Sequence, residues 1–255
     1  MRAGQLLAWG LSFAIAASAS GQLGCDEKPP STKKEKAVDA GGATPTPTVA
    51  APQPPAKPPP ITVEPGAFAV GPERIMANDP DPIARLVALL TSRPDVADAV
   101  VDFEARRATK PSQVVTLLAA LKKAKAKGAT VHTETREKTM GALEVTFLAA
   151  PPSDCTAVAL IGRDGAILVW PAGGGTAKRY SRGFAGPDMT LGTEGVREVA
   201  SRCESPVLLV GADDAMNWGL VYDLAAISKS SGSLKPTQVA IVPGTTVGGR
   251  KVIFE

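Results

Sequence analysis

The stretch VLLVGADDAMNWGLVYDLAAISKSSG, residues 207–232, joins an apolar run to an acidic corner and then to a helical pattern. Val207 to Val210 has the composition of a buried strand, and Trp218 to Ser231 has the length and periodicity of a helix. Gly232 follows as a helix stop signal. The stretch therefore predicts a buried strand that leads through Asp213-Asp214 into a helix.

This pattern occurs twice in the chain. Residues 101–120, VDFEARRATKPSQVVTLLAA, align without gaps with residues 208–227, LLVGADDAMNWGLVYDLAAI, in the order of elements and in many apolar positions. We interpret the recurrence as an internal repeat of about 90–100 residues. The identities are few, so a chance recurrence of two similar units stays open as an alternative.

Each repeat opens with two apolar runs around a turn, which is typical of a β-hairpin. The sequence then predicts a helix, a strand, a second helix and two further strands in each unit. The expected fold is α+β: two tandem small domains, 61–150 and 151–255, each a mixed β-sheet with two helices in the order ββαβαββ. The predicted elements are Ile61–Glu64, Ala67–Val70, a helix from Asp81-Pro82 through Leu90, Ala99–Glu104, Pro111–Lys127, Thr130–Thr135 and Ala142–Leu148, and then Thr156–Ile161, Ala166–Trp170, a helix from Val196 to Cys203, Val207–Val210, Trp218–Ser231, Gln238–Val242 and Lys251–Phe254.

Residues 1–25 have the pattern of a bacterial export signal, with Arg2 before a long apolar run. Leu23-Gly24-Cys25 resembles the lipobox of bacterial lipoproteins, although Gln22 stands where that pattern usually has an aliphatic residue. We expect Cys25 to become the lipidated N-terminus. A retained membrane helix over Gly4–Gly24 and simple cleavage after Ala19 are the alternatives.

Residues 26–60 carry ten prolines and very few large apolar side chains, so they predict a disordered tether rather than a packed domain. At about 3.1 Å per residue it could reach roughly 100 Å. The whole chain has 28 basic and 25 acidic side chains. This balance gives no overall field that would recruit nucleic acid.

Cys155 and Cys203 are expected to form a disulfide. Export would place them in an oxidising compartment, and each precedes a strand that should begin at the same end of a parallel sheet. A buried free thiol at Cys203, on the apolar face of its helix, is the alternative.

The second repeat resembles the periplasmic domain of the ExbD/TolR family, small subunits of proton-driven inner-membrane motors. The resemblance is weaker in the first repeat, where Arg106 replaces the aspartate and Pro111 the aromatic residue. The residues that carry it are Val207–Val210, Ala212-Asp213, Trp218, Val221, Asp223 and Gly232.

The resemblance implies an exported, dimer-forming domain that associates with peptidoglycan or with energised envelope proteins. No acidic residue occurs between Met1 and Gly24, where the family carries its proton-coupling aspartate, so motor activity is not implied. We therefore expect a non-enzymatic periplasmic scaffold or accessory protein. It would be anchored through an N-terminal lipid or helix, without a cofactor.

The aligned corners of the repeats carry opposite charges, which suggests an intramolecular pseudo-dimer. The candidate partner-binding residues are Arg106, Arg107, Asp213, Asp214 and Trp218. Asp213-Asp214 would more simply favour the start of a helix. A solute-binding module, an enzyme, or a cation site with Asn217 and Asp223 is the alternative.

The other polar signals are weaker. His132 is the only histidine, so it predicts no histidine metal cluster and is expected to be exposed on a strand. Gly173 to Gly175 lacks the helix start of a phosphate-binding loop and is expected to be a flexible loop.

Overall fold

A computed structural model describes residues 58–148, 155–184, 186–201, 203–230 and 236–253. Cys25, nearly all of the tether and the joint at 149–153 lie outside these ranges. The described chain is α+β, with two mixed β-sheets and four helices, as the sequence predicts. Among these residues no helix combines the length and the apolar composition needed to cross a bilayer.

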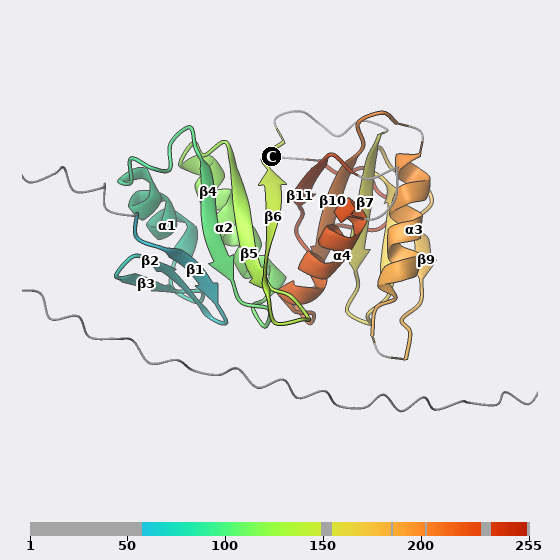
Figure 1. Cartoon of the computed structure of the whole chain (residues 1–255), viewed down its shortest axis with the longest axis horizontal. Coiled ribbons are helices and arrows are strands. Elements are labelled where there is room, and N and C mark those ends of the chain that lie inside the picture. The colour runs from blue at the N-terminus through green and yellow to red at the C-terminus, as the bar shows by residue number, and fades with distance from the viewer. Residues whose placement is uncertain (1–57, 149–154, 185, 202, 231–235, 254–255) are drawn as a thin grey trace, which may run out of the picture. The chain divides into compact units, whose positions relative to one another are not determined.

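The first half, residues 58–148, contains one six-stranded sheet with the order β3-β2-β1-β4-β5-β6 (Figure 1). Strands β1, β4 and β5 are mutually parallel, whereas β2, β3 and β6 run antiparallel to their neighbours. Its elements are β1 (Ile61–Glu64), β2 (Ala67–Val70), β3 (Glu73–Met76), α1 (Pro82–Thr91), β4 (Val100–Ala105), α2 (Pro111–Lys123), β5 (Gly128–Glu134) and β6 (Met140–Thr146).

The opening hairpin turns at Gly66, whose φ of 83° is a conformation that suits glycine. Strand β3 was not expected from the sequence, so the predicted order is wrong at this point. It pairs with β2 and brings Ile75 opposite Phe68, and both side chains are buried. A four-residue strand with one buried side chain has too little alternation to be recognised from sequence alone.

The two helices of the first half begin differently. Asp81 caps α1, because its carboxylate accepts a hydrogen bond of 3.0 Å from the backbone N–H of Ala84. Lys110 precedes α2 and makes no such side-chain bond. Helix α2 ends at Lys123, and Gly128 begins β5 instead of closing the helix as predicted.

The second half, residues 155–253, contains a five-stranded sheet with the order β11-β10-β7-β8-β9. Strands β7, β10 and β11 are parallel, and β8 and β9 are antiparallel additions. Its elements are β7 (Thr156–Ile161), β8 (Ile167–Pro171), β9 (Lys178–Tyr180), α3 (Met189–Ala200), β10 (Val207–Ala212), α4 (Trp218–Ser230) and β11 (Gln238–Ile241).

The second half also departs from the predicted order. Strand β9 is an addition, and residues 251–253 form no strand although Lys251–Phe254 was predicted as one. The backbone N–H of Val252 donates instead to the carbonyl of Ala172, at 2.9 Å. The C-terminal segment therefore packs beside the end of β8, where Val252 joins a small cluster with Trp170.

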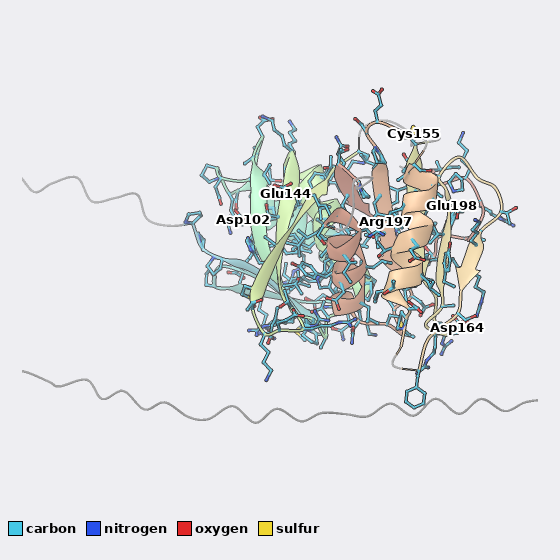
Figure 2. The ribbon with its side chains drawn as sticks, turned by 45° about the vertical axis from the view of Figure 1, so that its right-hand side comes forward. Asp102, Glu144, Cys155, Asp164, Arg197 and Glu198 are labelled. Carbon is cyan, nitrogen blue, oxygen red and sulfur yellow. A yellow bond between two sulfur atoms is a disulfide. The ribbon has the colours of Figure 1, made fainter. Side chains whose placement is uncertain are left out.

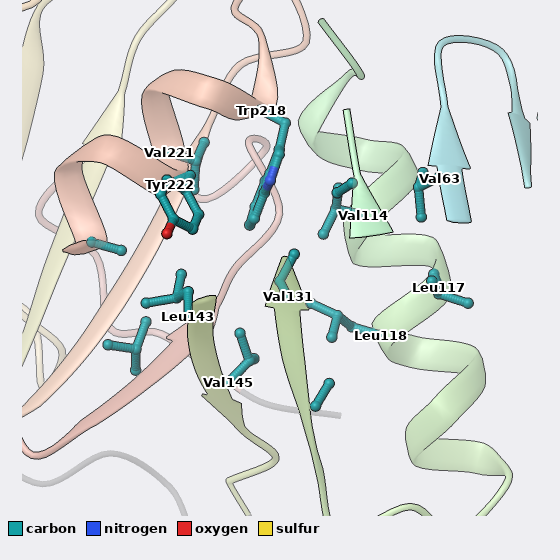
Figure 3. Close-up of a cluster of buried hydrophobic side chains, with 14 of the residues drawn as sticks. Val63, Val114, Leu117, Leu118, Val131, Leu143, Val145, Trp218, Val221 and Tyr222 are labelled. Atoms are coloured by element: carbon teal, nitrogen blue, oxygen red, sulfur yellow. The ribbon is translucent and has the colours of Figure 1, made fainter. Parts of the chain in front are cut away.

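One apolar core includes side chains from both halves. Helix α4 of the second half packs against β5 and β6 of the first, as well as against its own strand β10. Figure 3 shows Trp218 and Tyr222 of α4 beside Val131 of β5 and Leu143 of β6. The contact between the halves, called the junction below, is thus part of the hydrophobic core.

The edge strands β6 and β11 lie side by side at the junction (Figure 1). No backbone ladder joins them within the described ranges, because β6 pairs with β5 and β11 with β10. Counted from the outer edge inward, the strand order β3-β2-β1-β4-β5 in the first sheet corresponds to the strand order β9-β8-β7-β10-β11 in the second sheet. The two halves thus share an arrangement of five strands, to which the first half adds β6, and they meet through β6 and β11.

Candidate functional site at the junction

The acidic corner between β10 and α4 uses its two aspartates differently. The backbone N–H of Asp213 donates to the carbonyl of Ile161 at 2.9 Å. The carboxylate of Asp213 accepts from the backbone N–H of Ala215 at 2.8 Å. Asp213 therefore closes a local turn, a common use of an aspartate side chain.

Asp214 caps a helix of the other half. One of its carboxylate oxygens accepts a hydrogen bond of 2.9 Å from the backbone N–H of Ser112, in the first turn of α2. The first N–H groups of a helix have no partner within the helix, and a negative charge is favoured there. Asp214 thus supplies the side-chain cap that Lys110 does not.

We predict that Asp214→Ala lowers the free energy of unfolding by about 1 kcal/mol, because a side-chain acceptor at the start of α2 is lost. Asp214→Asn keeps an oxygen at the same position and should cost less. Urea unfolding followed by circular dichroism would measure both. Equal losses in the two variants would show that the carboxylate acts through its charge and not as a cap.

Trp218, the first residue of α4, is fully buried against the first half. Its indole N–H donates to the Thr133 hydroxyl at 2.9 Å, and its backbone N–H donates to the Thr109 carbonyl at 2.7 Å. The next N–H, of Gly219, donates to the Arg107 carbonyl at 3.0 Å. The first turn of α4 is therefore capped by the loop between β4 and α2.

Asp223, one turn further along α4, binds two arginines of the first half. Arg107 makes a bidentate pair, with nitrogen to oxygen distances of 2.8 and 3.0 Å, and Arg136 adds a bond of 2.7 Å from Nε. The Asp223 side chain is only 8% exposed. Gly219 leaves room for the guanidinium of Arg107, because an added Cβ would lie 2.9 Å from its Cζ.

The charge state of Asp223 follows from these contacts. Burial alone would raise its pKa, but the hydrogen bonds from Arg107 and Arg136 outweigh burial and hold the pKa below the usual value for an aspartate. The carboxylate is therefore ionised at neutral pH. The group forms an ion triad that connects the two halves.

The opposite charges at the aligned corners do not pair with one another in the described structure. Arg107 pairs with Asp223 and not with Asp213 or Asp214. The Nε of Arg106 lies 3.5 Å from a carboxylate oxygen of Glu104, and the Arg106 side chain is exposed whereas that of Glu104 is partly exposed. Of the five candidate partner-binding residues, Arg107, Asp214 and Trp218 contact the other half of the same chain. Arg106 and Asp213 make local contacts.

The predicted alternative of a cation site is not supported by the geometry. Asp223 is already engaged by two cations, and Asp213 by a backbone N–H. A pocket of about 470 Å³ lies at the start of α2 and is lined by Asp214, but not by Asp213, Asn217 or Asp223. No group of three or more metal-binding side chains occurs within the described ranges.

His132 lies on the opposite face of β5 from Thr133. Its Nε2 is 2.8 Å from a carboxylate oxygen of Asp102 on β4, and its side chain is 38% exposed. The histidine is thus partly exposed on a strand and takes no part in the junction.

The predicted disulfide between Cys155 and Cys203 is present, with a Cα to Cα distance of 5.5 Å. Cys155 precedes β7, and Cys203 lies three residues beyond the end of α3 rather than on its apolar face. The disulfide lines a pocket of about 480 Å³ with Trp170, Gly174 and Gly175. Figure 2 labels Cys155 at this end of the second half.

No protein-family model, no curated protein and no solved structure matches this chain. Its function is therefore inferred from the residues and contacts described above.

The sequence alone did not indicate Arg136 or Thr133 as junction residues. One signal was present: Asp223 interrupts the apolar run of α4, WGLVYDLAAI. A carboxylate on the buried face of a helix needs a cationic or hydrogen-bonding partner. That requirement predicts a partner for Asp223 but not its identity, because the arginines lie 116 and 87 residues away.

Proposed function

We propose that this protein is a non-enzymatic cell-envelope scaffold or accessory protein, resembling the periplasmic part of ExbD/TolR subunits. The observation that carries the proposal is the ion triad of Arg107, Asp223 and Arg136. It supports the view that the two repeats bind each other as a pseudo-dimer within one chain. Such a fused pair would present a fixed surface to an envelope partner.

The proposed location is the periplasm, with a lipid anchor at Cys25. The Cys155–Cys203 disulfide supports an oxidising, extracytoplasmic compartment. The export-like sequence at residues 1–25 and the proline-rich tether support attachment to a membrane at a distance.

The proposed role is binding rather than energy conversion. The apolar N-terminal run has no carboxylate that could carry protons. The buried carboxylate of Asp223 has both oxygens engaged by arginines, so it is suited to holding the halves together. Peptidoglycan or an envelope protein is the proposed partner.

The proposal is tested by producing the full chain in a Gram-negative bacterium and fractionating the cells. We expect the protein in the membrane fraction, with Cys155 and Cys203 resistant to alkylation until reduction. Cys25→Ala should release it into the soluble periplasmic fraction. Recovery in the cytosol with two reactive thiols would contradict the proposed location.

The scaffold role needs a separate measurement. Residues 55–255, which form one compact unit, are incubated with isolated peptidoglycan and sedimented. In parallel, a photo-crosslinking residue at the partly exposed Glu104 of the full chain reports protein contacts in cells. Saturable sedimentation, or one reproducible crosslinked envelope protein, is expected. The absence of both would overturn the scaffold role.

A further inference from the structure

A narrow turn between β9 and α3 presents a fully exposed phenylalanine. Gly183 and Gly186 exchange backbone hydrogen bonds of 2.8 and 3.3 Å, and Phe184 stands between them without burial in the described structure. The turn therefore holds a large apolar side chain in water. A single exposed apolar residue is common, so its surroundings decide what it can do.

Three arginines lie in or beside the two turns at this end of the second half. Arg182 precedes the turn, and its aliphatic part packs over Gly165 of the turn between β7 and β8, where an added Cβ would lie 3.5 Å from the Arg182 Cδ. Arg163 is exposed in that same turn. Arg179 of β9 forms an ion pair with Asp164, which Figure 2 labels at this end of the molecule.

A second apolar side chain follows the turn. Leu191, in the first turn of α3, is 41% exposed. Asp188 caps this helix by accepting from the Leu191 backbone N–H at 3.1 Å. Asp164 pairs with Arg179, and Asp188 accepts from a backbone N–H, but both carboxylates keep their negative charge. With Arg163 and Arg182, these groups carry three positive and two negative charges, a net charge of +1, and Arg163 and Arg182 make no ion pair among the described residues.

We propose that this end of the second half, the Phe184 tip, binds the surface of an anionic phospholipid bilayer. The Phe184 tip comprises Arg163, Arg179, Arg182, Phe184 and Leu191. Phe184 and Leu191 enter the boundary between headgroups and acyl chains, while Arg163 and Arg182 keep their guanidinium groups among the phosphates. Each basic residue near such a surface strengthens binding about fivefold.

A bilayer fits the Phe184 tip better than a protein pocket does. Phe184 lies in a turn and Leu191 in the first turn of α3, so the two apolar groups are separate side chains, whereas protein interfaces usually offer a contiguous apolar centre. Binding through a few side chains is weak. It becomes effective when a tether of limited length keeps the domain near the same membrane. The inference itself does not depend on the nature of the N-terminal anchor.

The test uses purified residues 55–255, which lack the N-terminal apolar run, and sedimentation with phospholipid vesicles. One set is phosphatidylcholine alone, and in the other about a third of the lipid is phosphatidylglycerol. We expect binding to the anionic vesicles only. Phe184→Ser should weaken it about tenfold, since a large apolar side chain no longer enters the lipid. Arg163→Gln with Arg182→Gln should weaken it further and reduce its dependence on salt.

Val100→Ser is the matched control, because Val100 is a 59% exposed apolar residue on the first half. It should leave vesicle binding unchanged. Failure of the wild-type protein to bind anionic vesicles would overturn the proposal and favour a protein ligand for Phe184. Binding that survives Phe184→Ser at full strength would also overturn it, since another basic surface would then be responsible. Circular dichroism of each variant separates these outcomes from misfolding.

Discussion

Replacing Trp218 by alanine is expected to lower the free energy of unfolding by about 4 kcal/mol. The indole is fully buried between α4 and the first half, so its loss leaves a cavity in the shared core. The Thr133 hydroxyl also loses the N–H that it accepts. A buried polar group without its partner adds a further cost of about 1 kcal/mol or more. Urea unfolding followed by circular dichroism measures the change.

Trp218→Phe separates the two contributions to this loss. Phenylalanine fills most of the space but has no N–H, so we expect a smaller loss of about 1–2 kcal/mol. The unfolding transition of Trp218→Ala should remain a single cooperative step, because both halves share one core. Two separate transitions would mean that one half stays folded alone. A change below about 1 kcal/mol for Trp218→Ala would mean that Trp218 is not part of the core.

Replacing Asp223 by alanine is expected to cost about 3 kcal/mol. The substitution leaves Arg107, which is only 27% exposed, without the bidentate partner that compensates its partial burial. Arg136 is 57% exposed and can return to water at little cost. Glu144→Ala is the matched control, because it removes a second ion pair of the junction, with Lys229, in which Glu144 is 78% exposed. That exposed pair should contribute less than about 1 kcal/mol.

The contribution of Asp223 also has a predicted pH dependence. Its pKa in the folded protein is lower than its pKa of about 3.9 in the unfolded chain. A carboxylate of this kind stabilises the fold above the unfolded pKa and loses that effect as the pH falls through the folded pKa. The difference in stability between wild type and Asp223→Ala should therefore be full at neutral pH and shrink below about pH 4. A difference that stays constant down to pH 2 would contradict the triad.

The elements with strong local patterns could be predicted from the sequence. The apolar run of β10, the stripe of Leu86 and Leu90 in α1, and the cap at Asp81 each follow from a few neighbouring residues. The disulfide could be predicted because two parallel strands bring Cys155 and Cys203 to one end of a sheet. These features depend on local periodicity and on the order of strands and helices, and both can be inferred from a sequence.

The remaining features depend on distant partners. Strands β3 and β9 have four and three residues, so neither shows a clear alternation. The predicted strand at Lys251–Phe254 has strand-like residues, but its backbone pairs with Ala172 instead of β11. At the junction, Asp214 and Asp223 were recognised as candidates, yet the groups that they bind were not. No local rule relates a carboxylate to an arginine or an N–H about a hundred residues earlier.

The cap that Asp214 provides to α2 has a consequence for how the chain reaches its fold. The bonds that join the halves link residues 85, 102 and 116 positions apart, as in Trp218 to Thr133, Asp214 to Ser112 and Asp223 to Arg107. Such contacts raise the contact order, and the entropy of closing long loops must be overcome before they form. While the chain is synthesised, the first half has an incomplete helix start and an uncovered apolar sheet face until α4 has been made. Folding of the two repeats is therefore expected to finish together, late and comparatively slowly.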